Sequence, residues 1–376
     1  MDFNFTAEQQ MLRDTVARYF ADHYDFGQRQ AMVRSAAGWR PGVWRGLAAD
    51  IGVLGAPFSE ALGGLGGGAI ENLVVMEEIG RALVIEPYLD TVVLGGALLR
   101  RWNTPRAHEL IGQAIAGEAR FAFAQLEPGS AYDLADVGTV AAASAGEWRI
   151  SGLKDAVRGA PFATHLIVTA RTDGGRHDRD GVSAFLVTCG AAGVSLREYP
   201  TVDGSRAADI RFEGAVGEPI GEAGRGFALL EAAVDEGVAA LCAEAVGVMR
   251  RLLSDTVEYT KQRRQFDAPI AANQALQHRM VDMYIAVEQA VSMTYMATLK
   301  LDRPAQERIR AVAAAKVQVG KALRFVGQGA IQLHGGMGMT NELAISHYFK
   351  RATMLESQLG SVDHHAARIE QCDAAN

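Results

Sequence analysis

The feature that most constrains the fold is a series of long helix-forming segments after residue 218. Apolar residues recur at helical spacing over residues 223–266, 273–301 and 306–336, with polar side chains between them. Consecutive helices of this length bury their apolar faces best against one another, in an up-down bundle. The sequence therefore predicts a C-terminal four-helix bundle domain over residues 218–376.

Residues 119–217 have a different character. Short β-type runs, including "RFAFAQLEP", "THLIVTARTD", "SAFLVTC" and "ADIRFEGAV", are separated by Gly, Asp and Pro. This spacing predicts a middle β-sandwich or barrel over residues 119–217. The charged stretch "DGGRHDRDG" between two of the runs is interpreted as a solvated loop.

Residues 1–118 favour helices again. Thr6 is a good N-cap for "AEQQMLRDTVARYFADHY", in which Met11, Val16 and Phe20 fall on one face. The glycines from 63 to 68 lack the spacing and the Lys-Ser/Thr pair of a phosphate loop, so we expect a turn between helices. The predicted fold is α+β: an N-terminal α-helical domain, a middle β domain and a helical bundle.

Charge and composition exclude several classes of function. The net charge of −7 does not favour a large nucleic-acid-binding surface. Three widely separated cysteines form neither a metal spacing nor a disulfide framework, which suits a reducing cytoplasm. No window holds eighteen uninterrupted apolar residues, and the N-terminus lacks a secretory pattern. We expect a cytoplasmic protein without metal, nucleic-acid or membrane partners.

Four stretches, in order, resemble characteristic words of the acyl-CoA dehydrogenase family. They are "LGAPFSEALGGLGGGAIENLVVMEEIGRAL", "LEPGSAYD", "YTKQRRQFDAPIAANQALQHRMVDM" and "GQGAIQLHGGMGMTNE". Two others, "VDEGVAALCAEAVG" and "HYFKRATMLESQLGSVDHHAARI", look like the small subunit of pimeloyl-CoA dehydrogenases. The resemblance implies an FAD flavoprotein that desaturates acyl-CoA thioesters: a carboxylate takes the α-proton and the flavin accepts the β-hydrogen as hydride.

The resemblance also implies two sets of FAD contacts. One set is lent across a dimer interface to the diphosphate and adenosine end, and its positions are all filled here, by Arg263, Phe266, Gln332, Gly335 and Gly336. Arginine supplies forked donors for phosphate oxygens, and glycine lets the backbone approach closely. The alternative for Arg263 is a solvated charge at a helix end.

The other set holds the flavin ring within the same subunit, and it is altered. The family's Thr, Ser, Trp and Thr positions correspond to Leu126, Tyr132, Ala156 and Arg158. Tyr132 and Arg158 retain polar groups, and Arg158 is a candidate cofactor contact. An exposed loop residue is the alternative for both.

The position of the family's catalytic base is also altered. The usual glutamate corresponds to Leu359, which cannot accept a proton, and a second position used by some members is Gly237 here. Glu236 and Glu356 lie nearby in sequence and are the candidate catalytic bases. A solvated surface glutamate is the default interpretation of each.

Two adjacent histidines, His364 and His365, follow Asp363 close to Leu359. Adjacent residues of a helix point about 100° apart, so the pair cannot face one metal ion. We therefore predict no metal site. Asp363 is interpreted as the N-cap of the last helix or as an ion-pair partner of Arg368.

Three functions remain open. The chain is an acyl-CoA dehydrogenase with a displaced base, in a homo- or hetero-oligomer built as a dimer of dimers. Alternatively, it is a base-deficient partner of a second acyl-CoA dehydrogenase chain in a heterotetramer, contributing FAD contacts in trans. A flavin-free scaffold of the same fold is the third, since fold alone does not determine activity. A flavin monooxygenase is a weaker fourth.

Overall fold

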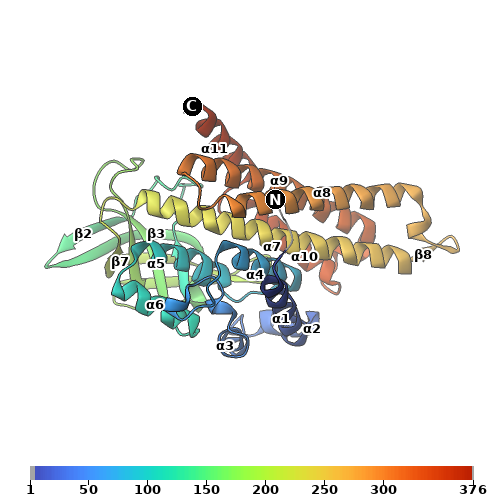
Figure 1. Ribbon diagram of the computed structural model, residues 1–376, viewed down its shortest axis with the longest axis horizontal. Helices are drawn as coiled ribbons and strands as arrows, with labels where there is room; N and C mark the ends of the chain where they lie inside the picture. Colours follow the sequence, from blue (N-terminus) through green and yellow to red (C-terminus); the bar gives the residue numbers. More distant parts are fainter. Residues whose placement is uncertain (1–4, 375–376) are drawn as a thin grey trace. The chain divides into compact units, whose positions relative to one another are not determined.

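The computed structural model describes residues 5–374, and their contacts divide the chain into two units. The bundle unit contains residues up to 31, residues 69–84 and the chain from 238 onward. The sheet unit contains residues 32–68 and 85–237. The order of helices, strands and helices along the sequence is as predicted (Figure 1).

The bundle unit is helical, and α8, α10 and α11 all pack against α9. Figure 1 shows the long helices in yellow to red. Its helices are α1 (Ala7–His23), α2 (Phe26–Arg34), α4 (Ala69–Ala82), α7 (Phe227–Gln262), α8 (Gln274–Leu299), α9 (Ala305–His334), α10 (Ala344–Ser357) and α11 (Val362–Ala374). Residues 32–34 of α2 and 227–237 of α7 are counted with the sheet unit. Between them lie the hairpin strands β8 (Arg264–Gln265) and β9 (Ala268–Pro269), and the short helices η5 (Ile270–Ala272) and η6 (Gly335–Met339).

The start of α1 confirms one prediction and corrects another. Thr6 Oγ1 accepts from the backbone N–H of Gln9, and the Gln9 side chain accepts from the Thr6 N–H. This reciprocal capping box satisfies two donors that the helix itself cannot. Val16 and Phe20 are buried, whereas Met11 is 68% exposed, so the prediction for Met11 was wrong. The helical period placed it on the apolar face, but its side chain is left largely exposed within residues 5–374.

Helices α4 and α7 approach so closely that backbone meets backbone. A Cβ at Gly80 would lie 2.0 Å from the Glu244 carbonyl oxygen, and one at Gly247 would lie 1.9 Å from the Glu77 carbonyl oxygen. A real side chain cannot occupy that space, so each glycine fits against the other helix. This contact sets the distance between the two helices.

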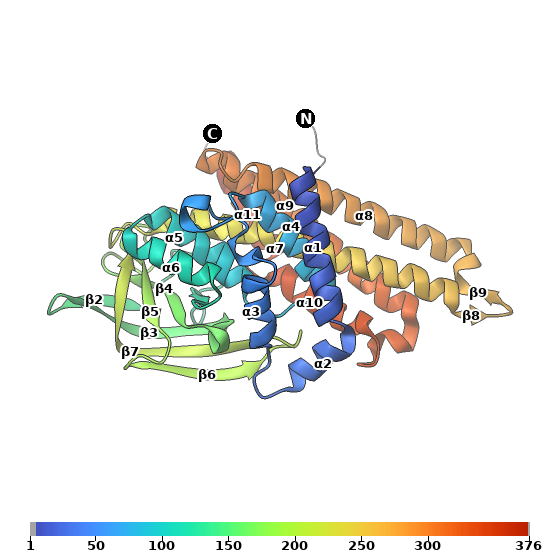
Figure 2. The same ribbon diagram turned by 60° about the horizontal axis from the view of Figure 1, so that its bottom comes forward.

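The sheet unit combines seven strands with short helices, and Figure 2 shows its strands. Packing brings η3 against β1 and α5 against β7. The strands are β1 (Phe121–Ala124), β2 (Val140–Ser144), β3 (Glu147–Arg158), β4 (His165–Arg171), β5 (Val182–Thr188), β6 (Val194–Pro200) and β7 (Arg206–Ile220). The helices are α3 (Pro41–Ala49), η1 (Val53–Gly55), η2 (Glu60–Leu62), η3 (Leu89–Gly95), α5 (Gly96–Trp102), α6 (Pro105–Ile115) and η4 (Ala160–Phe162).

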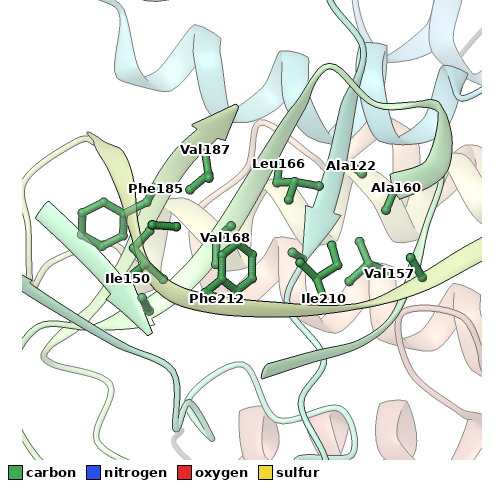
Figure 3. Packing of buried hydrophobic residues seen from close by; sticks show 14 of the residues in the cluster. Ala122, Ile150, Val157, Ala160, Leu166, Val168, Phe185, Val187, Ile210 and Phe212 are labelled. Atoms are coloured by element: carbon green, nitrogen blue, oxygen red, sulfur yellow. The ribbon is translucent and has the colours of Figure 1, made fainter. Parts of the chain in front are cut away.

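The strand pairings close on themselves. β4 pairs with β2, β2 with β3, β3 with β7, β7 with β5, and β5 with β4 again. β1 and β6 are added to this circuit at β4 and β7. A closed circuit of strands is a barrel, and its interior is filled by side chains such as Ile150, Leu166, Phe185 and Phe212 (Figure 3).

The sequence prediction missed one strand of the sheet unit. Strand β6 was not predicted, because its residues alternate only weakly and most are exposed.

Within residues 5–374, no helix is long and apolar enough to cross a membrane.

Candidate cofactor and catalytic site

The hairpin after α7 presents two of the predicted cofactor residues to the outside. Arg263 is fixed through its backbone, which accepts from Ile270 N–H and donates to Tyr259 O (both 2.8 Å). Its exposed guanidinium has no hydrogen bond or ion pair to any residue between 5 and 374. Phe266, at the hairpin tip, has φ 52° and is fully exposed. An exposed aromatic side chain on a residue with positive φ, which no other described residue covers, indicates a surface that contacts another molecule.

The turn after α9 is equally open. Gln332 is exposed on the last turn of the helix, and Gly335 follows with φ 59°. A Cβ added at Gly335 or Gly336 would meet no atom within 4 Å, so the backbone is open to the close approach of a ligand.

His334 packs against this turn. Its ring stacks on Tyr259, with centroids 4.2 Å apart, and its Nδ1 lies 2.8 Å from Ala330 O. Burial lowers the pKa of His334, which keeps the ring neutral. Tyr259 Oη also donates to His334 O (3.3 Å), so the end of α7 and the glycine turn are joined. The exposed side-chain donors of Arg263 and Gln332 and the open backbone of the glycine turn suit the diphosphate end of a dinucleotide.

The ring-end positions in the sheet unit fit a flavin less well. Leu126 and Ala156 carry no polar side-chain group, and the Ala156 N–H already donates to Asp209 (3.1 Å). Arg158 pairs with the buried carboxylate of Asp203 (3.2 Å). Its Nη1 is buried and has no hydrogen-bond partner within the described residues. That nitrogen remains available to donate to a ligand.

A buried ion pair that sequence reasoning missed supports the "LEPGSAYD" turn. Lys154 is completely buried and donates to Glu127 (2.6 Å), Thr169 (2.8 Å) and Gln125 O (3.2 Å). Glu127 also accepts from the N–H groups of Gly138 and Thr139. Burial lowers the pKa of Lys154 to about 8, although Glu127 opposes this shift. No sequence signal marked this pair, because β3 also carries Glu147, Arg149, Asp155 and Arg158.

The region of Leu359 is held by a histidine and contains no base of its own. Leu359 (φ 54°) and Gly360 (φ 118°) break the chain between α10 and α11. His365 is completely buried, and burial lowers its pKa to about 3, so the ring is neutral. Its Nε2 donates to Leu359 O (3.0 Å), whereas its Nδ1 has no partner within residues 5–374. The histidine therefore fixes the turn.

The prediction that Asp363 caps α11 was wrong. The backbone N–H of His364 donates to Ser361 Oγ (3.2 Å), so Ser361 is the capping residue. The helix begins at Val362, two residues earlier than a cap at Asp363 implies, which places Asp363 in its first turn. No group of three or more metal-ligating side chains is found in the part of the chain that the structure describes.

Both candidate bases are already engaged by arginines. Glu356 on α10 pairs with Arg324 of α9 in the bundle unit. Glu236 lies in the sheet unit, where Arg100 (2.7 Å) and Arg101 (2.6 Å) both bind it. A carboxylate that serves as a base must be available to substrate, so each residue remains a prediction.

The chain matches three models of one family along its length. These are the acyl-CoA dehydrogenase N-terminal domain (residues 6–107), middle domain (122–215) and C-terminal domain (224–371). The probable acyl-CoA dehydrogenase YngJ of Bacillus subtilis (strain 168) is 28% identical over 373 residues, which is 95% of each chain.

Solved structures agree. A chain of the ChsE4–ChsE5 complex from Mycobacterium tuberculosis superposes with a TM-score of 0.91 and is 26% identical, over 100% of both chains. The FAD complex of PigA superposes with a TM-score of 0.91 and is 26% identical, over 100% of this chain and 99% of that one. From the three family matches and these sequence and structural similarities, we conclude that the chain belongs to the acyl-CoA dehydrogenase family.

Proposed function

We propose that this chain is a subunit of an FAD-dependent acyl-CoA dehydrogenase, which removes hydrogen from Cα and Cβ of an acyl-CoA thioester. The observation that carries the proposal is the outward-facing group formed by Arg263, Phe266, Gln332, Gly335 and Gly336. The side chains of Arg263 and Gln332 have no partners within the described residues, and the two glycines leave room for a ligand. We call this group the presented set.

Four members of the presented set would each have a role toward the cofactor. The guanidinium of Arg263 would bind phosphate oxygens through forked, permanently charged donors. The two glycines would allow backbone amides to approach the diphosphate, and Phe266 would cover apolar surface beside it. Bound FAD would supply the hydride acceptor, which the protein itself lacks.

A second candidate function is supported by Leu359. Without a carboxylate there, the chain would serve as the base-deficient partner in a heterotetramer. It would contribute the presented set to FAD bound by a second acyl-CoA dehydrogenase chain, whose own glutamate would take the α-proton. The likeness to the ChsE4–ChsE5 complex supports such pairing of two chains.

Finer assignments belong to the same proposal. They are a dimer of dimers, a cytoplasmic location, the closeness to the pimeloyl-CoA dehydrogenase small subunit, and domain limits at residues 118 and 217. The words "VDEGVAALCAEAVG" and "HYFKRATMLESQLGSVDHHAARI" support the small-subunit assignment.

The visible spectrum tests these functions. The chain is purified alone, its flavin absorption is recorded, and a panel of acyl-CoAs is added without oxygen. Stoichiometric flavin that bleaches with one acyl-CoA supports a self-sufficient dehydrogenase. Flavin that binds only after co-expression with a second dehydrogenase chain supports the partner role. Absence of flavin under both conditions would contradict the proposal and favour the scaffold.

A further inference from the structure

The bundle unit contains a cavity that includes none of the candidate cofactor or catalytic residues. Its volume is about 370 Å³, which lies at the lower end of the range for small-molecule sites. Residues of α1, α2, α4, α7 and α10 line it, and several of these helices are labelled in Figure 2. One wall is apolar, formed by Ala17, Phe20 and Leu83.

Three arginines from three helices line the same cavity. Arg29 is buried, and its Nε donates to Leu83 O (2.9 Å), just beyond the end of α4. Arg81 and Arg251 are about half exposed, at 54% and 47% of their side chains. The Nε of Arg251 already donates to Asp255 (2.8 Å), which leaves its two Nη groups for a ligand. Their guanidiniums supply charge and forked donors beside an apolar wall.

Two carboxylates line the cavity as well, and they offset this charge only in part. Asp25 is committed to the start of α2, where its Oδ1 accepts from Gln28 N–H (2.8 Å). Glu78 is buried, and its one ion pair within residues 5–374 is a loose contact of 3.7 Å with Arg81. Burial raises the pKa of Glu78, although Arg81 opposes the shift, and this favours its neutral form. The lining therefore has a positive excess.

We propose that this cavity binds a small organic anion, with its carboxylate on Arg81 and Arg251 and its apolar body against the wall formed by α1. The excess of guanidinium groups selects the anionic head, and the wall at Phe20 selects a hydrocarbon or aromatic body. Inorganic ions lack the body, and neutral alcohols lack the charge.

Octanoate is the probe, and its binding to the full-length protein is measured by isothermal titration calorimetry. The wild type is expected to bind octanoate saturably and at least tenfold more tightly than octan-1-ol. Arg81→Gln should weaken octanoate binding at least tenfold. The matched control is Arg18→Gln, an exposed arginine on α1 outside the cavity, which should leave binding unchanged.

A second variant tests the cavity itself. Ala21 is an exposed lining residue, so Ala21→Phe should fill part of the space without disturbing the core. It is expected to weaken octanoate and octan-1-ol binding alike. Absence of saturable octanoate binding to the wild type would overturn the proposal. So would equal affinity in the wild type, Arg81→Gln and Ala21→Phe, or inorganic phosphate binding as tightly as octanoate.

The Glu78→Gln variant distinguishes an anionic ligand from a ligand that also has a positively charged group. Removing a carboxylate should leave octanoate affinity unchanged or increase it. A tenfold loss would mean that Glu78 contributes an attraction, and the anionic class would then be wrong.

Discussion

The presented set and the region around Leu359 lie in the same unit but are built in opposite ways. Arg263 and Phe266 are exposed, and the glycine turn is open. Around Leu359, by contrast, His365 is buried and holds the turn, and Glu356 is engaged by Arg324. The chain retains the presented set, which could contact a cofactor bound by another subunit, whereas its own position for the catalytic base holds the aliphatic Leu359. A subunit that contributes cofactor contacts to a neighbouring subunit would show this contrast.

The test that could break this comparison most completely concerns the base. General-base catalysis contributes about 10²–10⁴ in rate, so the loss of a true base must be of that size. If the contrast holds, Glu356→Gln and Glu236→Gln will each change the rate of flavin bleaching less than threefold. The measurement is anaerobic stopped-flow mixing of the flavin-loaded protein, or its complex, with acyl-CoA. A hundredfold loss in either variant would identify a displaced base and end the contrast.

Among the expected changes, Lys154→Met should produce the largest, a loss of stability. It leaves the buried Glu127 without its charged partner, and breaking such a pair costs about 3–5 kcal/mol. Denaturant unfolding of the flavin-free chain measures this loss. Lys154→Met combined with Glu127→Gln should recover part of it. Equal stability of the single and double variants would show that the pair has no coupled role.

Arg263→Gln sharpens the comparison from the presented side. Hydrogen bonds to charged groups contribute about 1.5–3 kcal/mol, so FAD affinity should fall roughly thirtyfold. The unfolding midpoint should not change, because the guanidinium has no partner within the described residues. Lys261→Gln, an exposed neighbour paired with Glu258, is the matched control. Equal losses of flavin in both variants would reduce the role of Arg263 to general charge.

His365 should give the smallest effect, as acid sensitivity. Burial lowers its pKa from 6.5 to about 3, so the unfolded chain binds a proton that the folded chain does not. Stability is therefore complete above pH 6.5 and falls as the pH drops toward 3, by about 2 kcal/mol at pH 5. His365→Gln should reduce this loss, and His364→Gln, its less buried neighbour, should not. Parallel pH curves for the wild type and His365→Gln would contradict the assignment.

The sequence alone predicted those elements in which a regular pattern of residue types reflects burial or exposure. The apolar period predicted α7, α8 and α9, and Thr6 marked the start of α1. Arg263 and Gly335 could be placed because short words with fixed spacing surround them. Their exposure also follows from local structure, a hairpin and a helix end.

Other features depended on residues that are distant in sequence. Arg100 and Arg101 reach Glu236 from another helix, and Lys154 reaches Thr169 across the sheet. No local pattern reveals such partners, so Glu236 could be suggested as a base without its arginines being foreseen. The cap of α11 was misplaced by two residues because Ser361 and Asp363 are both good capping residues.

The crossing of α4 and α7 has a consequence for how this sequence can change over time. Gly80 and Gly247 each lie against the backbone of the opposite helix, so an added methyl at either position acts as a wedge. Relieving one wedge moves both helices and thereby opens space at the other glycine. Among related chains, these two positions are therefore expected to vary together, as one joint constraint rather than two independent ones.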